Sequence, residues 1–101
     1  MDHLIPPPDP SALISVQYTQ ALIFKSQGET VQALAKFREI LYLSAEDSET
    51  RLEAVQLLLE LGEREAAMKE LVIAIFNAMD PEVSEKAQKL WKENVSHVIG
   101  I

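Results

Sequence analysis

Apolar side chains recur at helical spacing along most of the chain, and a few prolines, glycines and polar stretches divide this pattern into segments. No proline occurs between residues 11 and 80, and this region is rich in Ala, Leu, Glu, Gln and Lys, a composition that favours helices over strands. Asp9-Pro10 and Asp80-Pro81 each place an N-cap residue before a proline suited to the first helical position. The pattern therefore predicts an all-α fold of about five helices, near residues 10–27, 30–43, 48–61, 64–79 and 81–97.

The breaks inside the helical region recur at a fixed spacing. Gly28 and Gly62 are 34 residues apart, and residues on both sides of the two glycines match at the same offset. The matching pairs are Ala21 and Val55, Phe24 and Leu58, Ala33 and Ala67, and Phe37 and Leu71. The chain therefore contains an internal repeat, present twice.

A 34-residue unit of two helices resembles the tetratricopeptide repeat. The family's small, aromatic and turn positions are matched by Ala21, Phe24, Gly28, Ala33 and Phe37 in the first unit and by Leu58, Gly62, Ala67, Leu71 and Ala74 in the second. The resemblance covers residues 14–81, but Gln17 and Gln20 replace a large apolar pair, and Ala45 stands where the family's closing proline is expected. An ordinary antiparallel helical bundle is the alternative.

The resemblance implies a stack of two helical hairpins, closed by the fifth helix as a C-terminal cap. One side of the last segment carries Val83, Ala87, Leu90, Trp91 and Val95, and the other side is charged, which suits the end of a stack. We expect Trp91 to plug the last hairpin. The expected organisation is a Pro-rich arm at 1–9, a single tetratricopeptide-like domain at 10–98 and a short tail at 99–101.

Charge and composition exclude several classes of function. The net charge of −7 and the absence of a Lys/Arg cluster argue against a nucleic-acid-binding surface. The chain has no cysteine, which excludes disulfides and thiolate metal sites and fits a reducing compartment. The N-terminus lacks the features of a secretory signal, and no apolar run is long enough to span a bilayer. These features predict an acidic, cytoplasmic protein.

The residues that catalysis needs are not grouped in this sequence. His3 and His97 lie near opposite ends of the chain, and neither has a second ligand at helical spacing. Each internal glycine is solitary, so there is no phosphate-binding loop, and no serine lies in a nucleophile-elbow motif. We expect no catalytic, cofactor-binding or metal-binding residues, and a protein that is not an enzyme.

The first helix indicates binding instead. No charge occurs from Pro10 to Phe24, and apolar residues point nearly all round this helix, so more than one of its faces should be covered. The resemblance implies that the first helix of each hairpin lines a concave groove. The groove residues it assigns to partner binding are Tyr18, Leu22, Lys25, Leu52, Gln56 and Leu59.

These residues suit an interaction module, an adaptor or chaperone that binds an amphipathic helix or an extended apolar peptide of another protein. They lack the Lys, Arg and Asn clamp with which other members of the family bind a terminal carboxylate. A structural homodimer through the uncharged first helix is one alternative, and coverage of the groove by the chain's own arm, with Leu4 and Ile5, is another. The general character of the chain also resembles the small tetratricopeptide-like chaperones of type III secretion.

Overall fold

The computed structural model describes residues 9–99, and this part of the chain is all-helical. The five helices are α1 (Pro10–Ser26), α2 (Thr30–Leu43), α3 (Ser48–Glu60), α4 (Arg64–Asn77) and α5 (Pro81–Ile99). Each lies within two residues of the bounds expected from the sequence. The expected N-terminal arm and C-terminal tail lie outside the described residues, except for Asp9 and Ile99.

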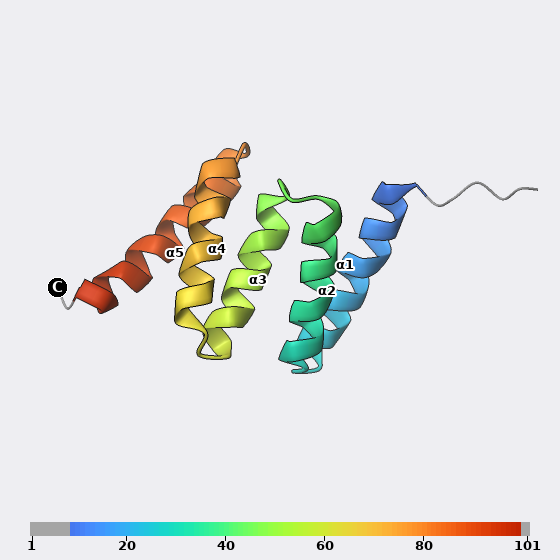
Figure 1. The fold of residues 1–101 in the computed structure, drawn as a ribbon, viewed down its shortest axis with the longest axis horizontal. Coiled ribbons are helices and arrows are strands. Elements are labelled where there is room, and N and C mark those ends of the chain that lie inside the picture. Colours follow the sequence, from blue (N-terminus) through green and yellow to red (C-terminus); the bar gives the residue numbers. More distant parts are fainter. Residues whose placement is uncertain (1–8, 100–101) are drawn as a thin grey trace, which may run out of the picture.

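The helices form two antiparallel hairpins and a closing helix, arranged in a row (Figure 1). α1 packs on α2, α3 packs on α4, and α2 and α3 join the two hairpins. The connections α2–α3 and α4–α5 lie at one edge of the row, so α1, α3 and α5 all begin at that edge (Figure 1). This arrangement confirms the expected hairpin stack with a C-terminal helix.

Each hairpin turns at a glycine with a left-handed backbone. Gly28 has φ +77° and Gly62 has φ +78°, a region that L-residues enter at a steric cost. At the first turn, the Glu29 N–H donates to the Phe24 carbonyl at 2.9 Å and the Gly28 N–H donates to the Lys25 carbonyl at 3.1 Å. This is the Schellman pattern of a helix C-terminus.

The second turn repeats these hydrogen bonds. The Glu63 N–H donates to the Leu58 carbonyl at 2.8 Å, and the Gly62 N–H donates to the Leu59 carbonyl at 3.1 Å. The two glycines are therefore the equivalent hinges that their spacing predicts.

The core runs along the row between the helices. Small residues at repeated positions, such as Ala33 and Ala67, are fully buried and allow the helices of each hairpin to approach closely. The largest fully buried side chains are Phe37, Ile40, Leu57, Leu71, Val55 and Thr50. Each large apolar side chain contributes about 1.5–3 kcal/mol on full burial.

The three helices that begin at the same edge start with an aspartate cap. Asp9 Oδ1 accepts the Ser11 N–H at 3.2 Å, and Asp80 Oδ1 accepts the Glu82 N–H at 2.9 Å. Asp47 accepts both the N–H of Thr50 at 3.1 Å and its hydroxyl at 2.8 Å. These carboxylates bind the otherwise unpaired first N–H groups and lie favourably at the positive ends of the helix dipoles. None of the helices that the structure describes has the length and apolarity needed to cross a membrane.

Candidate partner-binding groove

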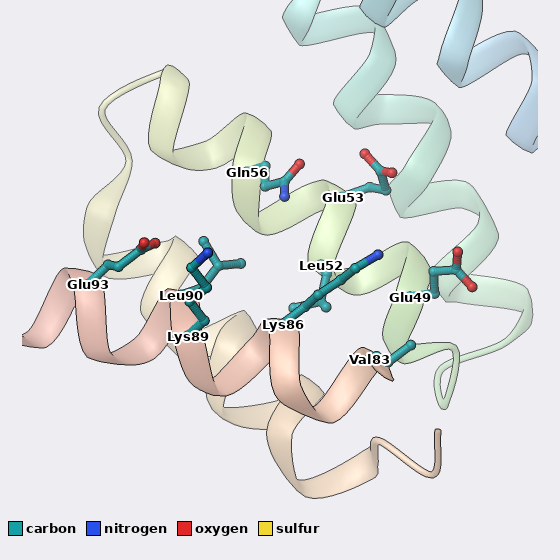
Figure 2. A pocket seen from close by; sticks show the side chains of 9 residues that line it. All are labelled: Glu49, Leu52, Glu53, Gln56, Val83, Lys86, Lys89, Leu90 and Glu93. Atoms are coloured by element: carbon teal, nitrogen blue, oxygen red, sulfur yellow. The ribbon is translucent and has the colours of Figure 1, made fainter. Parts of the chain in front are cut away.

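A hollow of about 340 Å³ lies between α3 and α5 (Figure 2). We call it the α3–α5 groove. It is lined by Glu49, Leu52, Glu53 and Gln56 of α3 and by Val83, Lys86, Lys89, Leu90 and Glu93 of α5. On each helix the lining residues are three or four positions apart, so each set forms one face of its helix.

The floor of the groove is apolar. Leu52 belongs to the core and is only 5% exposed, whereas Val83 and Leu90 are half-buried and pack against the core from α5. Because the floor residues are held by the core, the groove is part of the folded stack. A partner would reach the edge of Leu52 and more of Val83 and Leu90.

The rim of the groove carries both signs of charge. Glu49 and Glu53 come from α3, and Lys86, Lys89 and Glu93 come from α5. Figure 2 shows Lys86 extending from α5 across the hollow toward α3. A segment bound here would place apolar side chains on the floor and polar groups at the rim.

An ion pair joins helix α1 to the α3 side of the groove. Lys25 Nζ lies 2.8 Å from Glu53 Oε1, so α1 is tied to the wall of the groove. Leu22 lies three residues before Lys25 on the same face of α1 and is 40% exposed. Since about a third of the Lys25 side chain is exposed, this pair contributes little stability and chiefly sets the position of the two side chains.

Tyr18 connects α1 to the core. Its ring meets Phe37 edge-on, with centroids 5.6 Å apart and planes at 71°. Burial raises the pKa of the Tyr18 hydroxyl, and the negative charges of Glu53, Glu49 and Asp47 raise it further. The hydroxyl therefore stays neutral at physiological pH. The three carboxylates that act on it belong to the N-cap and the first two turns of α3.

The residues assigned from the sequence divide between three places. Leu52 and Gln56 line the α3–α5 groove, while Tyr18, Leu22 and Lys25 stand on α1, with Lys25 joined to the groove wall. Leu59 is half-buried against the core and does not line the groove.

Sequence reasoning missed the whole α5 wall. The one-sided apolar pattern of the last segment predicts only a cap, whereas Val83 and Leu90 also share a face with Lys86 and Glu93 that borders the groove. The spacing 83, 86, 90, 93 was the signal that could have revealed it. Trp91, the expected plug, is 36% exposed and borders a different hollow beside Met68 and Val72 of α4.

A metal site needs several ligating side chains that converge on one point. Within residues 9–99, no group of three or more His, Cys, Asp and Glu side chains is placed so that it could hold a metal ion. The apolar floor and mixed rim of the groove can bury apolar side chains and pair with charges of either sign.

The comparisons with known proteins give one result. No curated protein and no solved structure matches the chain. The family model of the tetratricopeptide repeat matches residues 25–90, which is more than half of the 101 residues. This match spans both glycine turns, the α3–α4 hairpin and the groove-lining part of α5 up to Leu90. Tetratricopeptide repeats generally mediate protein–protein interactions. The chain belongs to the tetratricopeptide repeat family.

Proposed function

We propose that this protein is a non-catalytic interaction module, an adaptor or chaperone, that binds an apolar helical or extended segment of another protein. The observation that carries the proposal is the α3–α5 groove, a hollow of about 340 Å³ with an apolar floor held in place by the core. Tyr18, Leu22 and Lys25 of α1 extend the binding surface beside it. Binding energy comes from burial of apolar side chains, about 1.5–3 kcal/mol for each one fully buried, less the cost of association.

The test uses a displayed library of random 16-residue peptides as the probe. Peptides selected on the wild-type protein are measured again by fluorescence anisotropy on Gln56→Trp, which fills the groove from an exposed position. The matched control is Gln88→Trp, also exposed but lining a hollow beside Trp91 and Phe76. Charged substitutions of Leu52 are unsuitable because this residue is buried in the core.

We expect Gln56→Trp to weaken binding of the selected peptides at least tenfold and Gln88→Trp to leave it within twofold. If no peptide is enriched over a surface without protein, or if Gln56→Trp binds as tightly as wild type, the groove proposal is wrong.

A second candidate is self-association through α1. Val16 and Ile23 are 53% and 50% exposed on a helix that carries no charge from Pro10 to Phe24, so two copies could meet there without burying a charge. This candidate predicts a mass near twice 11.3 kDa in light scattering at high concentration and a monomer for Val16→Glu. A wild-type mass of one chain at every concentration would exclude it.

A further inference from the structure

The α3–α5 groove continues into a second hollow at the edge where α3 and α5 begin. This hollow, of about 220 Å³, shares Glu49 and Val83 with the groove. We call it the acidic hollow, and its lining consists of Glu46, Asp47, Ser48, Glu49, Asn77, Met79, Asp80 and Val83. Figure 2 shows Glu49 and Val83 together at that end of the groove, with Glu93 toward the other end.

The charge of the acidic hollow is one-sided. Four of its lining residues carry carboxylates, and no lysine or arginine lines it. Asp47 and Asp80 are explained by the fold, because each caps the helix that follows it. Glu46 and Glu49 cap no helix, so their charges exceed what capping requires. The far end of the groove differs, since Lys89 accompanies Glu93 there, while Lys86 extends from α5 toward Glu49 and Glu53 of α3 (Figure 2).

An unpaired hydroxyl lies in the same lining. Ser48 is 8% exposed, and its Oγ is buried without a hydrogen-bond partner. A buried hydroxyl without a partner costs stability, so the lining holds a polar group that the fold leaves unsatisfied. A lysine ammonium or an arginine guanidinium would bring N–H donors and a positive charge to this lining.

The field of these carboxylates reaches across the groove side of the stack. Glu49 and Asp47, with Glu53, contribute to the raised pKa of the Tyr18 hydroxyl on α1. The charges of Glu49 and Asp47, which line the acidic hollow, therefore act beyond it, toward α1.

We infer that the segment bound in the α3–α5 groove carries lysine or arginine at the end that meets the acidic hollow. The apolar residues of the segment follow along the floor formed by Leu52, Val83 and Leu90. This inference rests on the proposed function, and charge complementarity is what selects the occupant: a protein segment that is apolar along one face and basic at one end. It also fixes the direction in which the segment lies.

The test compares the peptides that two charge-reversed proteins select from the same random 16-residue display library. Glu46→Lys/Glu49→Lys reverses the two carboxylates that cap no helix, and the caps Asp47 and Asp80 stay in place. The matched control, Glu63→Lys/Glu65→Lys, makes the same change at the start of α4, where Glu63 makes no side-chain cap and Glu65 lies in the first turn. Far-UV circular dichroism checks that both variants remain helical, and Glu46→Gln/Glu49→Gln serves as a milder replacement if the reversal unfolds the protein.

We expect wild type and the control to enrich peptides with Lys or Arg at one end of an apolar stretch. On Glu46→Lys/Glu49→Lys the same peptides should bind about tenfold more weakly at low salt, and this difference should shrink as salt is raised. Their affinity for the control should stay within twofold of wild type.

The outcomes separate this inference from the proposal beneath it. If Gln56→Trp blocks binding of the selected peptides, but these peptides have no basic end or bind Glu46→Lys/Glu49→Lys as tightly as wild type, the inference is wrong and the groove proposal stands. Peptides that Gln56→Trp does not block would overturn both. Selection of basic peptides by charge alone, without apolar residues, would also contradict the inference.

Discussion

The two hairpins of this protein share a plan but differ in what they bury. Both turn at a glycine with φ near +77°, and both hold a fully buried alanine five residues later. In α3, however, eight side chains are buried, whereas in α1 Ala21 alone among the described side chains is buried. The difference follows from position, because α3 contacts α2, α4 and α5 while α1 packs mainly on α2. The repeated residues determine the turns and the close helix contacts, whereas the number of neighbouring helices determines how many side chains each helix buries.

The sharpest contrast lies at one pair of equivalent positions. Arg51 on α3 is equivalent to Gln17 on α1, 34 residues earlier in the repeat. In the second helix of each hairpin, Glu70 on α4 is equivalent to Lys36 on α2 by the same spacing. Arg51 bonds to Glu70 and also donates to the Ala45 carbonyl at 2.6 Å. Gln17 has a buried Oε1 without a hydrogen-bond partner, and Lys36 instead lies 3.5 Å from Glu39 on its own helix. The second hairpin therefore has a polar cross-link that the first one lacks.

Removing this cross-link should have the largest effect. Arg51→Met keeps most of the buried volume but leaves Glu70 and the Ala45 carbonyl without their partner, so we expect a loss of about 2 kcal/mol in the free energy of unfolding. The cost stays below that of a fully buried pair because the Glu70 side chain is about a third exposed. Urea denaturation measures it.

Lys36→Met, at the position equivalent to Glu70, is the control and should change stability by less than about 0.5 kcal/mol. Glu70→Gln and the double variant complete a mutant cycle. Additive effects in that cycle would show that the Arg51–Glu70 contact contributes nothing of its own.

The two glycine turns, in contrast, should contribute equally to the stability of the protein. A Cβ added at Gly28 or Gly62 meets no heavy atom within 4 Å, so the cost of alanine is that of the left-handed backbone alone. We expect Gly28→Ala and Gly62→Ala each to lower the free energy of unfolding by about 1–2 kcal/mol, and by the same amount within about 0.5 kcal/mol. Thermal or urea unfolding of the two variants checks this. A clear inequality would mean that the turns are not energetically equivalent.

The sequence predicted the fold closely because the residues that determine it act locally. Asp9-Pro10 and Asp80-Pro81 mark where helices begin, Gly28 and Gly62 mark where hairpins turn, and the polar stretch 44–50 separates the hairpins, so all five helices could be placed within two residues. The groove was harder to predict because it forms between helices. The family resemblance implies a groove position for Leu52 and Gln56, but the pattern of the last segment predicts only a cap and not the α5 wall.

Coverage by a second molecule is also beyond what the single chain shows. The uncharged stretch of α1 predicts that something beyond α2 covers one of its faces, and Val16 and Ile23 are half-exposed in the single chain, so that expectation stays a prediction. Nor does periodicity reveal an unpaired hydroxyl such as that of Ser48, because its environment comes from how α3 meets its surroundings.

The smallest expected effect is a gain of stability in the weaker hairpin. Gln17→Leu replaces a buried amide oxygen without a partner by an apolar side chain, at a position where the tetratricopeptide pattern has a large apolar residue. We expect the free energy of unfolding to rise by about 1 kcal/mol, seen as a higher urea midpoint with an unchanged slope. Gln20→Leu, on the exposed side of α1, is the control and should change stability by less than about 0.5 kcal/mol. A loss of stability in Gln17→Leu would show that the amide is held by interactions that outweigh the burial of its oxygen, and the contrast between Gln17 and Arg51 would then disappear.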